Sequence, residues 1–84
     1  MKYIAMHGNM VYGRETMKTL AYAVALECGG KADGCLGWAS TEAGANEMAE
    51  MERAQLTDDC KVVIVPAIDV TKFPENVTRG LMWR

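Results

Sequence analysis

The chain has 84 residues with a formal net charge of −2, and half of its residues are apolar. This length leaves room for one hydrophobic core, so we predict a single domain over residues 1–84, with 69–84 as a C-terminal arm. The composition excludes a disordered chain, and the longest clearly apolar run, residues 20–26, is too short to cross a bilayer. We therefore expect a globular protein that has no membrane partner.

The charges are distributed unevenly along the chain. Residues 27–59 contain eight acidic and two basic side chains, whereas the segments on either side are mildly basic. A general nucleic-acid-binding protein carries a basic stripe, which this pattern lacks, so the sequence argues against direct nucleic-acid binding. The pattern favours an acidic face that meets a basic partner, such as the nucleic-acid-binding surface of another protein.

Three cysteines, Cys28, Cys35 and Cys60, occur in a chain with no recognisable export signal. Cytoplasmic proteins keep their thiols reduced, so we expect a cytoplasmic location and buried free thiols. The three cysteines and His7 could together supply four zinc ligands. Because no two cysteines have the CxxC spacing of a zinc site, we expect neither a metal nor another cofactor.

Residues 2–7 predict a strand, and the loop after it is a candidate anion-binding site. Its two glycines have the spacing of a phosphate-binding loop, but an arginine and a glutamate replace the lysine and the hydroxyl residue of that motif. Backbone amides at the start of a following helix could still hold an anion. The candidate anion-binding residues are His7, Gly8, Gly13 and Arg14.

Residues 15–28 have two possible structures. Their apolar side chains recur on one helical face, and three alanines favour a helix that ends at Gly29-Gly30. The apolar residues from 22 to 28 also alternate, which is typical of a strand. In this alternative, a hairpin pairs them with residues 35–40. We prefer the helix because alanine is a good helix residue and a poor strand residue.

The second half of the chain predicts a strand, a helix and another strand. Residues 35–39 predict the first strand, and Ser40 or Thr41 can cap the helix that follows. This helix should end near Leu56, with alanines and methionines on its buried face and glutamates on the exposed face. The run of β-branched residues within 61–68 predicts a strand that is buried on both faces.

Alternating strands and helices predict an α/β fold, a small sheet of three to four strands with two packed helices. If residues 22–28 form a strand instead, the sequence predicts an α+β fold of the ββαβ type. Both alternatives require a helix at residues 42–56 and a strand at residues 61–68.

The segment LGWASTEAGANEMAEM, residues 36–51, resembles part of the nucleoside 2-deoxyribosyltransferase-like proteins. There a strand ends in Leu-x-Gly-Trp or a similar motif, and a helix carries a glutamate that attacks the sugar carbon and frees the base. The resemblance implies this nucleophilic role for Glu47, with Thr41 in place of the family's serine and Ala43-Gly44 in place of its Gly-Ala pair. A catalytic carboxylate requires burial or a neighbouring acid, whereas the helical pattern places Glu47 on the exposed side.

The leading hypothesis is a small protein-binding domain without enzymatic activity that occludes a surface of its partner. It would use an acidic face, defined as Glu47, Glu50, Asp58 and Asp59, together with three aromatic anchors, Trp38, Trp83 and Tyr12. In size and composition the chain is similar to small phage-encoded inhibitors, including anti-CRISPR proteins. One alternative is a reduced deoxyribosyltransferase-like or nucleotide-binding protein that uses Glu47, and another is a self-associating protein that forms a homodimer.

Overall fold

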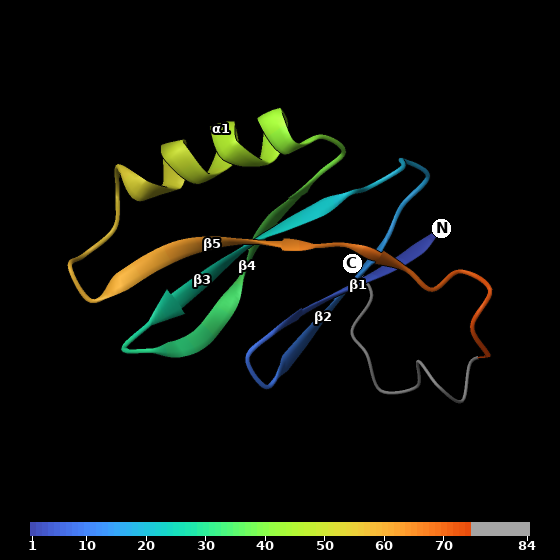
Figure 1. Cartoon of the computed structure of the whole chain (residues 1–84), viewed down its shortest axis with the longest axis horizontal. Helices are drawn as coiled ribbons and strands as arrows, with labels where there is room; N and C mark the ends of the chain where they lie inside the picture. The colour runs from blue at the N-terminus through green and yellow to red at the C-terminus, as the bar shows by residue number, and fades with distance from the viewer. Residues whose placement is uncertain (75–84) are drawn as a thin grey trace.

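The computed structural model describes residues 1–74, which contain one helix and six strands (Figure 1). In chain order the elements are β1 (Lys2–His7), β2 (Met10–Glu15), β3 (Tyr22–Cys28), β4 (Lys31–Ala39), α1 (Glu42–Arg53), β5 (Cys60–Pro66) and β6 (Ile68–Asp69). They form a small α/β domain, which confirms the predicted class, although one of the two expected helices is a strand. No helix in this part of the chain has the length and apolar character needed to cross a membrane.

The strands form two antiparallel sheets, ordered β2-β1-β6 and β4-β3-β5. β5 and β6 are consecutive in the chain, but β5 pairs with β3 and β6 pairs with β1. The Ala67 amide donates to the Ala21 carbonyl on the β3 side, and the Val70 amide donates to the Lys2 carbonyl on the β1 side. The segment from β5 to β6 therefore passes from the β4-β3-β5 sheet to the β2-β1-β6 sheet.

α1 covers one face of the β4-β3-β5 sheet (Figure 1). The helix begins after Thr41, whose side-chain oxygen accepts a hydrogen bond from the Gly44 amide at 3.0 Å, so the predicted cap is confirmed. Glu42 in the first turn and Arg53 in the last are both favoured by the helix dipole. The buried residues between the helix and the sheet are Val24, Ala39, Ala45, Ala49 and Val62.

The predicted helix at residues 15–28 is wrong, and the alternative hairpin is confirmed. β3 pairs with β4 on one side and with β5 on the other, so it is the central strand of its sheet. Val24 packs towards α1, whereas Ala23 and Ala25 are fully buried on the opposite face. Hydrogen bonds to two neighbouring strands and burial of both faces outweigh the helix propensity of the alanines.

The β2-β1-β6 sheet covers the face of β3 that α1 leaves open. Tyr3 and Ala5 on β1 are buried, as are Ala23 and Ala25 on β3, and β1 contacts both β3 and β5. Because the alanine side chains are short, the two sheets can approach each other closely at this point. The domain therefore has three layers, with α1 outside one sheet and the second sheet on the far side.

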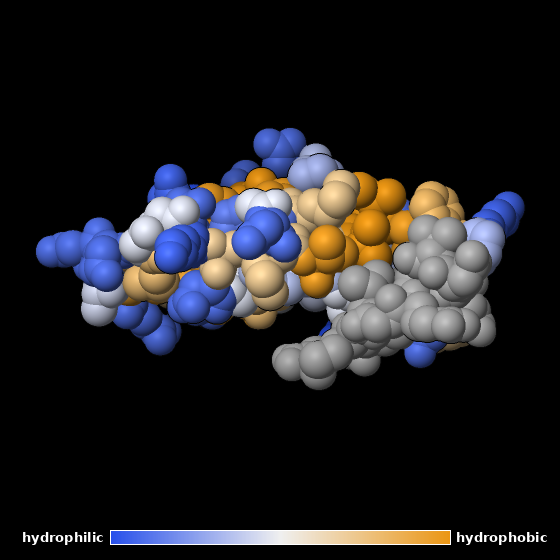
Figure 2. Space-filling view, turned by 90° about the horizontal axis from the view of Figure 1, so that it is seen from below, coloured by the Kyte–Doolittle hydropathy of each residue, from blue (hydrophilic) through white to orange (hydrophobic). Residues whose placement is uncertain are grey.

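The outer face of β1 and β2 carries exposed apolar side chains. Met6 lies directly opposite Val11 in the register, and these side chains are 54% and 42% exposed. Figure 2 shows the side of the molecule turned away from α1, where hydrophobic residues gather in one area. The acidic side chains of α1 lie on the other side of the domain, so the two outer layers differ in chemical character.

Candidate functional site

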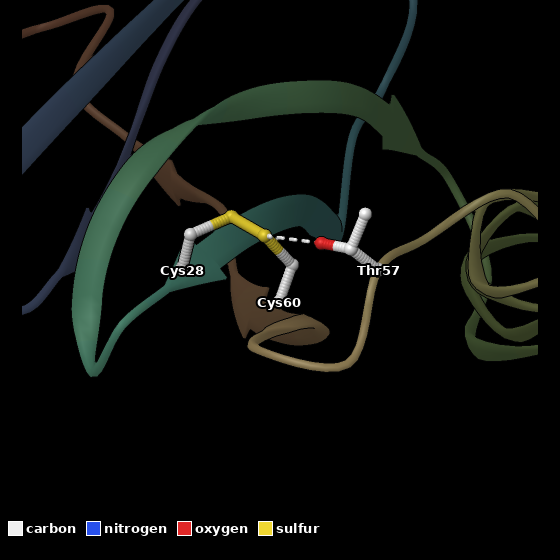
Figure 3. The surroundings of a disulfide bond; sticks show 3 residues. All are labelled: Cys28, Thr57 and Cys60. Carbon is white, nitrogen blue, oxygen red and sulfur yellow. Dashed lines mark hydrogen bonds between the residues drawn. A yellow bond between two sulfur atoms is a disulfide. The ribbon is translucent and has the colours of Figure 1, made fainter.

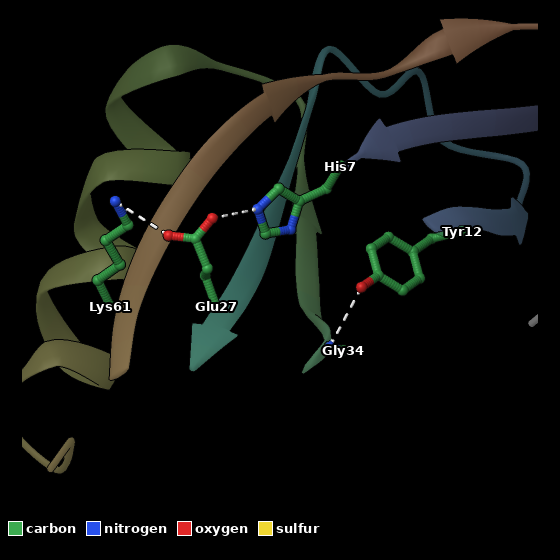
Figure 4. A network of polar contacts seen from close by, with 5 residues as sticks. All are labelled: His7, Tyr12, Glu27, Gly34 and Lys61. Carbon is green, nitrogen blue, oxygen red and sulfur yellow. Dashed lines mark hydrogen bonds and ion pairs between the residues drawn. The ribbon is translucent and has the colours of Figure 1, made fainter. Parts of the chain in front are cut away.

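His7, Glu27 and Lys61 form a polar network between the two sheets (Figure 4). His7 is the last residue of β1, and Glu27 on β3 lies directly opposite Lys61 on β5. The Nε2 atom of His7 is 3.3 Å from Oε1 of Glu27, and Nζ of Lys61 is 2.9 Å from Oε2 of the same carboxylate. One carboxylate therefore connects three strands.

The network is buried at the His7 end and open at the Lys61 end. The exposed fractions of the side chains are 10% for His7, 20% for Glu27 and 69% for Lys61. The Nδ1 atom of His7 is buried and has no hydrogen-bond partner within residues 1–74. Because Glu27 engages Nε2 and Nδ1 is enclosed, the ring joins the sheets and offers no free nitrogen to a ligand.

Glu27 carries its charge more readily than an ordinary glutamate. The hydrogen bond from Lys61 lowers its pKa below the ordinary value of 4.5; partial burial opposes this effect, and the hydrogen bond with His7 adds to it. A carboxyl group whose pKa is lowered in the folded state stabilises the fold above its unfolded pKa. That stabilisation is lost as the pH falls through the lower, folded value.

We expect the urea midpoint of unfolding to fall as the pH drops below about 4.5, and to fall less steeply in a Glu27→Gln variant. Asp69 also has a lowered pKa, because its carboxylate accepts hydrogen bonds from the Thr71 side chain and backbone. The difference between the two proteins isolates the part due to Glu27. Parallel curves for the wild type and the variant would show that the Glu27 contacts contribute nothing to stability.

Cys28 and Cys60 form a disulfide between β3 and β5 (Figure 3). They are directly opposite in the register, with their Cα atoms 4.0 Å apart, and the Thr57 hydroxyl donates a hydrogen bond to Sγ of Cys60 at 3.6 Å. The prediction of free thiols is wrong for this pair, because a strand in place of the expected helix brings the two cysteines together. Disulfides persist in oxidising compartments, so the thiol-based reason for a cytoplasmic location no longer holds, and the location stays a prediction.

A surface hollow lies beside the disulfide and the open end of the polar network. Three of its six residues are acidic and one is basic; the lining consists of Glu27, Gly30, Asp58, Asp59, Cys60 and Lys61. Within residues 1–74, no group of three or more histidine, cysteine or acidic side chains could hold a metal ion. Two members of the acidic face, Asp58 and Asp59, therefore line this hollow at the end of the domain where α1 stops.

The candidate anion site lacks the helix that it required. Gly8 forms the tight turn between β1 and β2 with a φ angle of +61°, and Gly13 lies inside β2, opposite Ile4. Arg14 is exposed on the same strand, and the His7 ring is held by Glu27. The predicted site therefore has no helical N-terminus whose amides could bind an anion.

The acidic face is exposed as predicted. Glu47 and Glu50 lie on the outer side of α1, and Asp58 and Asp59 lie in the turn before β5. Arg53 neutralises only Glu50, at 2.8 Å. Glu47 forms no hydrogen bond or ion pair with another described residue. A nucleophilic carboxylate is tuned by burial or by a second acid in contact with it, and Glu47 has neither of these surroundings.

The aromatic anchors have different surroundings from those expected of an exposed binding surface. The Tyr12 hydroxyl accepts a hydrogen bond from the Gly34 amide at 3.1 Å, which ties β2 to β4 (Figure 4). Trp38 is half-buried on β4, opposite Ala23. Trp83 and most of the predicted C-terminal arm lie outside the described residues. The Tyr12 hydroxyl thus links the two sheets, and the Trp38 side chain is only partly exposed.

The sequence analysis did not identify Glu27 or Lys61 as site residues, and it did not predict that they lie next to a disulfide between Cys28 and Cys60. The available signal was the alternation of residues 22–28, which places Glu27 and Cys28 on opposite faces of a strand. The same alternation in β5 places Lys61 and Cys60 on opposite faces. Pairing of these two strands in register was the step that the sequence did not supply.

No protein-family model, curated protein or solved structure matches the chain. The resemblance of residues 36–51 to nucleoside 2-deoxyribosyltransferase-like proteins therefore stays a prediction.

Proposed function

We propose that the protein is a small binding domain that docks on a basic surface of a partner protein through the acidic face. The separation of charge along the fold carries this proposal. Residues 42–59 contain six acidic side chains and one basic side chain. The four members of the acidic face are all exposed. This charge lies on α1 and the turn after it, away from the exposed apolar side chains of β1 and β2.

Within residues 1–74, most carboxylates of the acidic face form no ion pair. Lys61 forms its ion pair with Glu27, although it lines the same hollow as Asp58 and Asp59. In this described part of the chain, Glu50 is the only member of the acidic face that forms an ion pair, and its partner is Arg53. Uncompensated carboxylates on one side of a small domain create a directional field. Such a field accelerates encounter with a basic surface and orients the two proteins before contact.

An exposed apolar side chain lies within the same surface. Met51, which the helical pattern places on the buried side, is 66% exposed. Helical spacing puts it next to Glu47, which lies four residues earlier. Because surface charge contributes more to rate and specificity than to affinity, an interface also needs an apolar contact. Methionine is flexible and adapts to differently shaped surfaces, so Met51 is suited to this role.

The partner chemistry that fits this surface is a patch of lysine and arginine side chains, as found where proteins contact nucleic-acid phosphates. Occupation of such a patch would exclude the nucleic acid and thereby inhibit the partner. This mode of action agrees with the similarity in size and composition to small phage-encoded inhibitors.

A labelled decalysine peptide tests the location of the binding surface. We expect it to bind the wild-type protein at low salt, and we expect Glu47→Lys to weaken binding by about tenfold, with the wild-type affinity falling as salt rises. Fluorescence anisotropy measures both effects.

The matched control is Asp33→Lys, which changes the net charge equally at an exposed position on β4. If the two variants weaken binding to the same extent, net charge alone explains the binding and the acidic face is not a docking surface. Loss of binding only in Glu47→Lys supports the proposal.

A further inference from the structure

The outer edge of β2 has backbone groups arranged for pairing with another strand. Met1 and Thr16 exchange two backbone hydrogen bonds, of 2.7 Å and 2.9 Å, at the open end of the β1–β2 pair. Bonded and non-bonded pairs alternate along an antiparallel ladder. The residues whose N–H and C=O groups point away from β1 are therefore Val11, Gly13 and Glu15.

β2 lacks the bulges that interrupt many sheet edges. Its register with β1 is unbroken over all six residues, and β2 is the terminal strand of its sheet in the described part of the chain. β4, the terminal strand of the other sheet, is irregular in two places, where Leu36 and Asp33 have no direct partner on β3. Such bulges disrupt an edge and prevent further pairing, and β2 has none.

We propose that β2 pairs with β2 of a second copy of this chain, antiparallel and centred on Gly13. A two-fold axis at this residue places Val11 opposite Glu15 of the second copy, and Glu15 opposite Val11. Gly13 then faces its own counterpart. All three outward-pointing residues are paired in this register, and each pair exchanges two N–H···O bonds. The result is a continuous sheet across both copies.

The side chains agree with this register. Gly13 has no side chain, so this residue itself does not keep the two strands apart at the axis. On the face that carries Tyr12 and Arg14, each arginine of one copy lies opposite a tyrosine of the other, where a guanidinium is attracted to the aromatic ring. Arg14 is exposed, so it is accessible to this contact. A register shifted by one residue would leave the outward-pointing groups without partners.

The mass in solution tests the pairing directly. One chain has a mass of 9.2 kDa, and we expect light scattering to give twice this mass at high concentration. Gly13→Pro removes the N–H group at the axis without touching a bond to β1, so it should give a monomer. Gly13→Ala retains that N–H group and should remain dimeric. A wild-type monomer at every concentration, or a dimeric Gly13→Pro variant, would overturn the proposal.

Amide hydrogen exchange of the wild-type protein provides a second test that does not depend on a folded variant. The amides of Val11, Gly13 and Glu15 should exchange more slowly as concentration rises. Those of Tyr12 and Arg14, which bond to β1, should be protected at every concentration. Equal exchange of the first three amides in dilute and concentrated samples would refute the pairing. The Glu47→Lys variant should still have the mass of a dimer in solution. A loss of peptide binding in this variant would then be independent of the pairing through β2.

Discussion

Replacing both Cys28 and Cys60 by serine should lower the free energy of unfolding by about 3 to 4 kcal/mol. The disulfide joins positions 32 residues apart, and the chain-entropy model assigns this stabilisation to the closed loop that it imposes on the unfolded chain. Domains of this size have unfolding free energies of only about 5 kcal/mol or somewhat more. Loss of the disulfide therefore removes most of the free energy of unfolding, and we expect the variant to be partly unfolded near body temperature.

Urea unfolding followed by far-UV circular dichroism measures this effect. Wild-type protein treated with a reducing agent should behave like the double serine variant, because both have lost the same covalent link. Cys35→Ser is the control, since Cys35 is not part of the disulfide. An unchanged midpoint in the reduced wild type would mean that the bond between β3 and β5 does not contribute to stability.

Ala25→Leu should destabilise the domain by about 3 kcal/mol, close to the upper end of typical overpacking effects. Ala25 is completely buried on the face of β3 that meets the β2-β1-β6 sheet, where Ala5 is also completely buried. A leucine at this position must push the sheets apart or adopt a strained rotamer. Separation of the sheets would also break the contact between His7 and Glu27 and the hydrogen bond from Gly34 to Tyr12.

The matched control is Ala43→Leu, which adds the same side chain at an exposed position of α1 and should change stability by less than about 0.5 kcal/mol. Urea unfolding gives both values. In a folded Ala25→Leu sample, the amide of Gly34 should also exchange faster with solvent, because its bond to Tyr12 depends on the spacing of the sheets. Equal stability of the two variants would contradict the close packing of the layers at Ala25.

Local signals were sufficient for the second half of the fold. Thr41 accepts a hydrogen bond from the first turn of α1, and glutamate and arginine lie at the ends that the helix dipole favours. These interactions involve residues within one or two turns of each other, so the sequence contains all the information needed. The β-branched run of β5 likewise predicts a strand without reference to the rest of the chain. The exposed acidic residues of α1 followed from the same helical period.

The segment at residues 15–28 shows where local information ends. Its alanines and its apolar spacing fit a helix, and its alternation from residue 22 fits a strand. Only the presence of β4 and β5 on its two edges decides between them, because each supplies hydrogen bonds that an isolated segment cannot make. Once β3 is a strand, Cys28 meets Cys60 and Glu27 meets Lys61. The prediction of free thiols was wrong for Cys28 and Cys60 for this reason, and the anion site lost the helix start on which it depended because β2 continues to Glu15.

The sequence by itself determined that this is a small α/β domain with a capped helix at α1, a β-branched strand at β5 and acidic side chains facing solvent. Each of these features depends on residues close together in the chain, through helical or strand periodicity and the satisfaction of nearby backbone groups. The expected burial of both faces of β5 is wrong, because β5 lies at the edge of its sheet and only Val62 is buried. The tertiary structure alone decided the pairing of β3, the disulfide, the polar network between the sheets and the terminal position of β2 among the described strands of its sheet. These depend on which distant strands lie side by side, and the free energy of that arrangement is shared among many residues that no local pattern brings together.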